Sequence, residues 1–218
     1  MVHSRTLFNM SGHLHLLKYP RENFGRVDFC RLRTFLSYDI EDQELIEKIK
    51  LLQKELRASG ADLKLVEPET LHFTIRFLGE IEEVDKENII GHLSGKVDGY
   101  DQDVVFKGLG TFPDEKRISV VWVGIDGDSS KKLEEHARKV NKMIDDVPGI
   151  PRNNREGFSP HVTIARVKSG RNKEKLVETV RAHKNDELGS ARISNLHLKL
   201  STLTPSGPRY TDLHVFES

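Results

Sequence analysis

The amino-acid sequence predicts an α+β protein made of two related lobes that face one another. A His-x-Thr-Ile pattern occurs twice in apolar surroundings, at His72 and again at His161, and each copy is followed by a predicted helix. The predicted elements run strand-helix-strand-strand-helix, then two strands, a helix, a strand, a helix and two strands. This order is typical of a duplicated fold.

The first half of the chain supplies the earlier motif strand. Segment 33–40 is rich in β-branched and aromatic residues and is predicted to be a strand. Apolar residues at helical spacing predict a helix over 45–56, with Gly60 placed to end it. A short strand over 63–66, the motif strand over 71–79 and a helix over 84–93 follow.

The second half supplies the later motif strand. A glycine-containing loop through Gly108, Gly110 and Pro113 separates two strands that could form a long hairpin. The predicted elements are strands over 103–106 and 119–125, a helix over 127–144, a polar loop over 148–160, the motif strand from 161, a helix over 172–183, and strands over 193–200 and 211–216 on either side of a turn at 206–207. We expect His92, His136, His197 and His214 to lie on the surface.

Length and composition set the domain organisation. We expect residues 31–218 to form a single bilobal domain, which is large enough to bury a core without disulfides or metals. Residues 1–30 show no sustained period and are predicted to be a poorly ordered extension; a misassigned start codon is an alternative. The irregularly spaced His3, His13 and His15 favour a tail over a metal-binding tract.

Charge and cysteine content narrow the classes of function. Lys plus Arg and Asp plus Glu are both 34, so no basic excess favours broad binding along a nucleic-acid backbone. The single cysteine, Cys30, excludes an intrachain disulfide and suits a reducing compartment. Because no apolar segment is long enough to span a membrane, we expect a cytoplasmic protein that does not bind membranes.

Strict strand alternation assigns the motif residues to two faces. His72, Thr74 and Arg76 share one face, while Phe73, Ile75 and Phe77 share the other. In the second copy, His161 and Thr163 lie opposite Val162 and Ile164, and Arg166 falls on the side of these two apolar residues. A bulge or the end of the strand would be needed to bring Arg166 to the histidine side.

Two facing His-Thr pairs suit chemistry on a phosphodiester. Histidine titrates near pH 6.5, so one imidazole can accept a proton while the other donates one. The threonine hydroxyls can donate to the charged nonbridging oxygens. Alternatively, the histidines could be structural. A metal site is disfavoured because Thr is a poor ligand and no Asp or Glu shares the motif face, and no Ser or Cys is placed as a nucleophile.

The motifs also resemble those of a known family. His72–Gly79 and Pro160–Arg166 are similar to the two motifs of the two-histidine phosphoesterases, in the branch of RNA 2',3'-cyclic phosphodiesterases also called 2'-5' RNA ligases. Segments 33–39, 120–124 and 201–210 extend the similarity, which covers about residues 31–218. Residues 1–30 have no counterpart.

This resemblance implies two antiparallel sheets that face a central cleft, with helices on the outside, in a metal- and cofactor-independent monomer. The cleft would receive an RNA 3' end with a 2',3'-cyclic phosphate, or a small cyclic nucleotide, and yield a 2'-phosphate. His72 would be the general acid and His161 the general base. Binding would involve Thr74 and Thr163 at the phosphate, Arg166 also at the phosphate, and Phe77 near the base.

Several functions remain open at this point. Reversal, with a 5'-hydroxyl in place of water, would give 2'-5' ligation. The substrate could instead be a 2'-5' oligonucleotide or a cyclic ADP-ribose derivative. A module that binds RNA ends or nucleotides without turnover is the alternative outside the enzymes.

Overall fold

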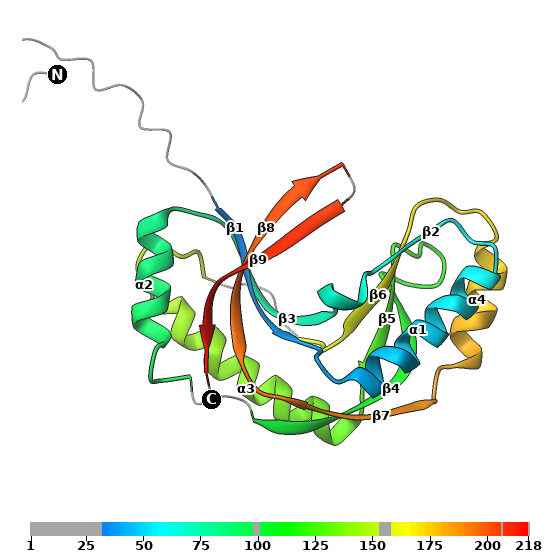
Figure 1. Cartoon of the computed structure of the whole chain (residues 1–218), viewed down its shortest axis with the longest axis horizontal. Coiled ribbons are helices and arrows are strands. Elements are labelled where there is room, and N and C mark those ends of the chain that lie inside the picture. Colours follow the sequence, from blue (N-terminus) through cyan, green and yellow to red (C-terminus); the bar gives the residue numbers. More distant parts are fainter. Residues whose placement is uncertain (1–31, 98–100, 153–157, 206, 218) are drawn as a thin grey trace, which may run out of the picture.

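The computed structural model describes residues 32–97, 101–152, 158–205 and 207–217, and two antiparallel sheets organise this part of the chain. The predicted extension over residues 1–30, including Cys30, lies outside the described residues. The first sheet has the order β3-β1-β8-β9 and the second β2-β6-β5-β4-β7, and Figure 1 shows them on opposite sides of the molecule with helices outside. The expected α+β architecture with two sheets is confirmed.

The strand bounds follow the sequence pattern closely near the motifs. The first sheet contains β1 (Leu32–Asp39), β3 (His72–Ile81), β8 (Leu196–Thr204) and β9 (Gly207–Phe216). The second contains β2 (Leu63–Leu65), β4 (Gln102–Phe112), β5 (Val120–Ile125), β6 (Val162–Val167) and β7 (Glu187–Ile193). Four helices are described: α1 (Gln43–Ala58), α2 (Glu83–Leu93), α3 (Gly127–Asp145) and α4 (Lys173–Ala182).

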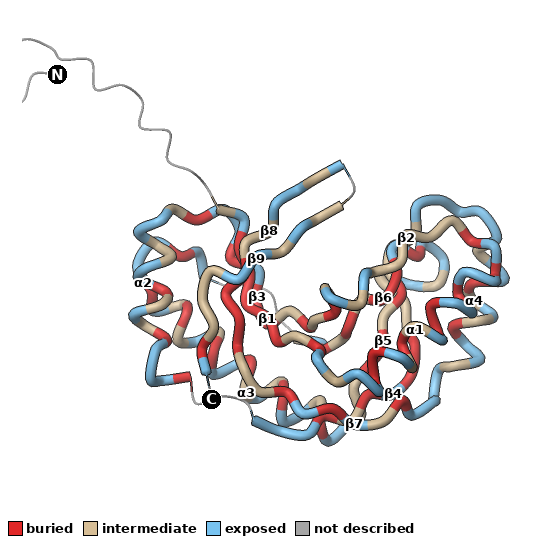
Figure 2. The backbone as a smooth tube through the Cα atoms, viewed as in Figure 1, coloured by how far each residue is buried: buried red, intermediate tan, exposed pale blue. Residues whose placement is uncertain are grey.

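The predictions for β4, β7, β8 and β9 were incomplete. Segment 108–112, expected to be a loop because of its glycines, continues β4 and pairs with β5 in the predicted hairpin. Gly110 is needed there because a Cβ would overlap the indole ring of Trp122 on β5. Strand β7 was not predicted separately, and β8 and β9 extend to the turn, forming a hairpin whose exposed tip projects from the sheet (Figure 2).

Helices α1 and α3 cross between the two lobes. α1 follows β1 of the first sheet but packs against β6, β7 and α4. α3 follows β5 of the second sheet but packs against β3 and α2, and also against β4. The C-terminal hairpin β8–β9 returns to the first sheet beside β1. Neither half of the sequence therefore forms a lobe by itself. The first half contributes α1 to the second lobe, and the second half contributes α3 to the first.

Several buried polar contacts fix these crossing helices. The hydroxyl oxygen of Tyr38 on β1 forms a hydrogen bond with Nε2 of His136 on α3, with the two atoms 2.6 Å apart. His136 was expected to be a surface residue, but this contact and its partial burial make it part of the α3 packing face. The carboxylate of Asp42 accepts from the backbone N–H of Leu45 at 2.7 Å and so caps the start of α1.

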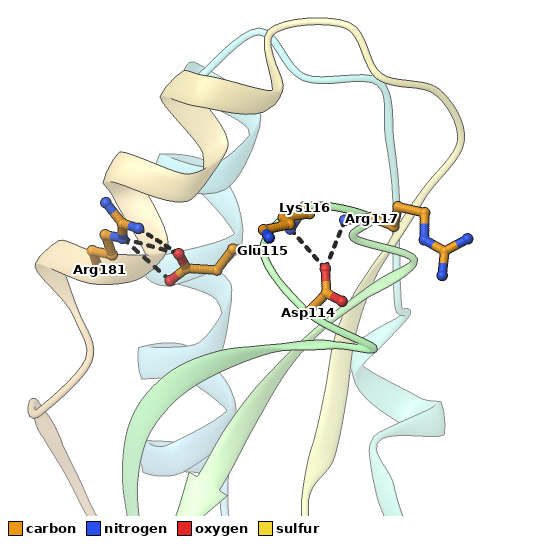
Figure 3. Close-up of polar contacts among 5 residues, drawn as sticks. All are labelled: Asp114, Glu115, Lys116, Arg117 and Arg181. Atoms are coloured by element: carbon orange, nitrogen blue, oxygen red, sulfur yellow. Dashed lines mark hydrogen bonds and ion pairs between the residues drawn. The ribbon is translucent and has the colours of Figure 1, made fainter.

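The loop after β4 is tied to α4 (Figure 3). The side chain of Asp114 accepts from the backbone N–H groups of Lys116 and Arg117 at 2.8 and 2.9 Å. Glu115 forms an ion pair with Arg181 of α4 at 2.5 Å. These contacts hold the loop that follows Phe112, whose ring lines the second motif.

Within the described residues, no helix is long and apolar enough to cross a membrane.

Candidate active site

A cavity of about 400 Å³ lies between the two sheets and is lined by both motif strands, β1, β2 and the β8–β9 hairpin. This volume lies in the usual range for a small-molecule site. All six residues singled out from the sequence line it: His72, Thr74, Phe77, His161, Thr163 and Arg166.

A bulge in each motif strand breaks the simple alternation. In β3, Arg76 pairs with Leu36 and Thr74 with Ser37, so Ile75 is an extra residue. In β6, Ala165 pairs with Val121 and Thr163 with Trp122, so Ile164 is the extra residue at the matching position. An extra residue moves the side chains that follow it to the opposite face, in β3 as far as a second extra residue at Leu78.

The bulges correct the face assignments made from strict alternation. Arg76, expected beside His72 and Thr74, is only 4% exposed and points toward α3. Phe77, expected in the core, is 67% exposed and lines the cavity. Arg166 also reaches the cavity side, through the bulge at Ile164. Phe77 and Arg166 therefore occupy the same position of the repeat, one aromatic and the other cationic.

The two histidines are held in the same way. Nδ1 of His72 lies 2.7 Å from the carbonyl oxygen of Thr70, and Nδ1 of His161 lies 2.7 Å from the carbonyl oxygen of Ser159. A carbonyl can only accept, so Nδ1 carries the proton in each neutral ring. Nε2 is then left to accept or donate a proton.

The electrostatic setting lowers the pKa of both imidazoles below the ordinary value. For His72 the main cause is burial, which outweighs the bond to Thr70 and the attraction of Asp39; the charges of Lys199 and Arg166 lower the pKa further. For His161, burial again outweighs the bond to Ser159. Both rings are thus favoured as neutral bases, and an anion bound between them would favour their charged forms.

Aromatic rings back both histidines. The ring of His72 meets Tyr210 edge-on with the ring centroids 5.2 Å apart and lies at the same distance from Phe35. The ring of His161 meets Phe112 edge-on at 4.8 Å and lies near Trp122 at 6.2 Å. These four supports were not predicted from the sequence, because long-range strand pairing brings them to the motifs.

A charged cluster lies under the first motif. The ammonium of Lys199 is 2.7 Å from both Asp39 and Asp212, and Nδ1 of His197 is 3.2 Å from Asp212. His197, expected on the surface, is instead 8% exposed. Asp39, His197 and Asp212 are spaced as metal ligands could be. The Lys199 ammonium already forms ion pairs with both carboxylates, so this geometry gives no reason to place a metal there.

Comparisons with known proteins agree with this architecture. A family model described as the AKAP7 2'5' RNA ligase-like domain matches residues 34–211. An RNA 2',3'-cyclic phosphodiesterase of Methanothermobacter thermautotrophicus is 35% identical over 187 residues, covering 85% of this chain and 98% of that protein. Another from Archaeoglobus fulgidus is 34% identical over 186 residues, covering 85% of this chain and all of that protein (100%).

A solved structure shares the fold. The crystal structure of a Thermus thermophilus protein superimposes with a TM-score of 0.68 at 23% identity, covering 85% of this chain and 97% of that one. The family model spans most of the chain, and the two curated relatives are matched along nearly their whole length. The protein therefore belongs to the AKAP7 2'5' RNA ligase-like family of the two-histidine phosphoesterase superfamily, together with the RNA 2',3'-cyclic phosphodiesterases.

Proposed function

We propose that the protein hydrolyses 2',3'-cyclic phosphate ends of RNA to 2'-phosphates, with His72 and His161 as an acid-base pair. One observation carries the proposal: two imidazoles, each bonded through Nδ1 to the backbone carbonyl two residues earlier, line one cavity together with two threonines and an arginine. The relatives named as RNA 2',3'-cyclic phosphodiesterases support this choice of substrate.

The proposed reaction is an in-line displacement at phosphorus. Nε2 of His161 takes a proton from water as the water oxygen forms a bond to phosphorus. The bond from phosphorus to the 3' oxygen breaks, and this oxygen takes the proton from Nε2 of His72. The product carries a 2'-phosphate and a 3'-hydroxyl, and one proton has passed from water to His161 and one from His72 to the leaving oxygen.

The phosphate oxygens need donors that are already in place. Thr74 and Thr163 present hydroxyls beside the two imidazoles, and Arg166 adds a guanidinium to the cavity wall. Such donors stabilise the negative charge of the transition state without having to reorganise. The bound phosphate raises the pKa of His72, so that this residue can carry the proton that it donates.

The unlike residues at the matching positions orient the substrate. Phe77 lies on the His72 side, since both rings pack near Phe35, at centroid distances of 6.1 and 5.2 Å. We propose that a nucleobase stacks on Phe77, which puts the bound nucleotide on the His72 side of the cavity. As the family resemblance implies, we assign the general acid, which acts on the 3' oxygen, to His72 and the general base to His161.

The same site could run in reverse. With a 5'-hydroxyl in place of water, the proton transfers above would produce a 2'-5' linkage. Both directions use only groups of this chain, so the proposal includes no metal or cofactor. We further propose that the protein acts as a monomer in the cytoplasm.

The position of the phosphate in the product tests the proposal. An RNA oligonucleotide ending in a 2',3'-cyclic phosphate is incubated with the protein in EDTA, and the product is separated from 2'- and 3'-phosphate standards. We expect the 2'-phosphate alone, formed at least about 100-fold more slowly by the His161→Ala variant. A 3'-phosphate product would overturn the assigned acid and base, and tight binding without turnover would identify a binding module. Faster turnover of a 2'-5' oligonucleotide or a cyclic ADP-ribose derivative would change the substrate class.

A further inference from the structure

The direction of Arg166 depends on one extra residue in β6. Without the bulge at Ile164, strict alternation would place Arg166 on the side of Val162, away from the cavity. Ile164 is fully buried, so its carbonyl needs a hydrogen-bond donor from within the protein. A donor to this carbonyl oxygen therefore also fixes the position at which the side chains of β6 switch from one face to the other.

The donors come from outside the β5–β6 ladder. The carbonyl oxygen of Ile164 accepts from the backbone N–H of Val66 at 3.0 Å and from Nε2 of Gln53 at 2.9 Å. The same amide group of Gln53 also donates to the carbonyl oxygen of Val66 at 2.8 Å. Gln53 is 5% exposed, and its amide joins the bulge to the segment that follows β2.

Gln53 comes from a helix that crosses between the lobes. It lies on α1, which follows β1 of the first sheet and packs on the second. Leucine or methionine would fill a position on this buried helix face without a polar atom to satisfy. The amide therefore contributes something that packing alone does not, one donor to the carbonyl of the bulge residue Ile164 and a second to the carbonyl of Val66.

The other motif strand is held in a comparable way. Directly after the bulge in β3, the buried guanidinium of Arg76 donates to the carbonyl oxygen of Asn141 at 3.0 Å and to Asp145 at 2.6 Å. Both partners lie on α3, the second crossing helix. In both motifs, then, a polar side chain links the bulge region to a helix that comes from the other half of the fold.

We propose that Gln53 is a positioning residue that acts through Arg166, by holding the bulge at Ile164 that turns Arg166 into the cavity. The inference rests on the proposed function, because its effect is read as catalysis at the phosphate. It predicts that loss of the Gln53 amide affects activity only while Arg166 is present.

A double-mutant cycle tests this dependence. The four proteins are the wild type, Gln53→Met, Arg166→Ala and the double variant, assayed for kcat/KM on an RNA 2',3'-cyclic phosphate. We expect Gln53→Met to lower kcat/KM by about 10- to 100-fold, the scale of a misplaced binding group. In the Arg166→Ala background the same change should cost less than about twofold.

Stability measurements separate a positioning role of Gln53 from a general loss of stability. Gln53→Met should lower the midpoint of thermal unfolding equally in both backgrounds, whereas its effect on activity should depend on Arg166. Gln43→Met is the matched control, because Gln43 lies on the same helix, is exposed, and bonds only locally to the carbonyl of Glu41. It should change neither quantity. Gln53→Asn, which keeps the amide but shortens its reach, replaces the methionine variant if that does not fold.

Two results would overturn the inference. One is an equal loss of kcat/KM in both backgrounds, and the other is a folded Gln53→Met protein with wild-type kcat/KM. A wild-type protein without turnover would contradict the proposed function instead. In that case the same four proteins are compared by their dissociation constants for adenosine 2'-monophosphate. Binding is measured from the fluorescence emission of Trp122, the single tryptophan of the chain. Equal weakening in both backgrounds would again reject the role of Gln53.

Discussion

The two cavity histidines share a bond to a carbonyl two residues earlier in the chain. In both copies the bond leaves Nε2 as the group that exchanges protons, and burial lowers the pKa of the ring. An acid-base pair works when one ring is charged and the other neutral. Because the two rings would bind one substrate, their titration is described by apparent pKa values of the pair.

These shifts predict an acidic optimum for kcat/KM. A lowered pKa means that a ring loses its proton at a lower pH, so the singly protonated pair is most populated below about pH 6.5. We expect a bell-shaped profile of kcat/KM with its maximum below that value. The maximum of kcat should lie higher, because the bound phosphate raises the pKa of the acid. Initial rates from pH 4.5 to 9 measure both; a kcat/KM optimum above pH 7.5 would contradict the account.

The sequence was informative about residue types and misleading about some of their directions. His72, Thr74, His161 and Thr163 precede the bulges, so alternation placed them together correctly. Arg76 and Phe77 follow a bulge and were assigned to the wrong faces by alternation, although the family resemblance placed Phe77 near a base. An isoleucine that bulges has the same local pattern as one that does not, so single-sequence alternation cannot reveal it.

Among the elements, the crossing helices do most to join the lobes. The contact of Tyr38 with His136 attaches α3 to the first sheet. Burial, with a smaller contribution from Lys139, lowers the pKa of His136 to about 4, compared with about 6.5 in an unfolded chain. Protonation therefore favours the unfolded state.

This shift predicts acid sensitivity of the fold with a defined sign. The neutral His136 contributes its full stabilisation above about pH 6.5, and the contribution is lost as the pH falls toward 4. The His136→Gln variant should lose less unfolding free energy than the wild type between pH 7 and pH 5. Urea denaturation at the two pH values measures this, and an unchanged difference would refute it.

His183, at the end of α4, serves as a control because its contribution to stability should depend on pH in the opposite direction. Burial lowers the pKa of His183, but its bonds to Asp186 and Glu55 outweigh burial and raise it. Its contribution is therefore complete below the unfolded pKa and is lost as the pH rises through the folded pKa. His183→Gln should cost more stability at pH 5 than at pH 8.

Helices were easier to predict than strand lengths. All four helices were placed, most firmly the one over 45–56 from its apolar spacing and the glycine that ends it, because an amphipathic helix records its buried face locally. Strand β7 was missed, and β4, β8 and β9 are longer than predicted. Strand β7 pairs with β4, which lies far away in the sequence, so the residues of β7 alone give little signal. The end of β4 pairs within its own hairpin with β5, but its glycines are typical of a loop, because the space that Gly110 leaves for Trp122 is evident only in the packed sheet.

At the scale of the whole molecule, the cavity requires both sheets at once. Its histidines come from different sheets, and its walls from strands near both ends of the described chain. The motif repeat predicted the two facing lobes. It did not predict that α1 and α3 each pack on the lobe of the other half. The spacing of apolar residues in a helix does not reveal which sheet the helix packs against.

The location of the cavity also predicts the effect of shortening the chain. Among the described residues, those that line the cavity begin at position 33, and the family match begins at residue 34. We propose that residues 31–218 form the functional domain. A chain that starts at Arg31 should keep kcat/KM within about twofold of the full-length protein on a short RNA substrate. A loss of tenfold or more would assign the first 30 residues a part in catalysis.

The central claim is that the two histidines work as one acid-base pair, and single-turnover rates test it most directly. The wild type, His72→Ala, His161→Ala and the double variant are compared on an RNA 2',3'-cyclic phosphate in EDTA, with folding checked by circular dichroism. We expect each single variant to lose about 10²- to 10⁴-fold. The double variant should lose far less than the product of the two, since groups that act as a unit are non-additive. A folded single variant that keeps the wild-type rate would contradict the account.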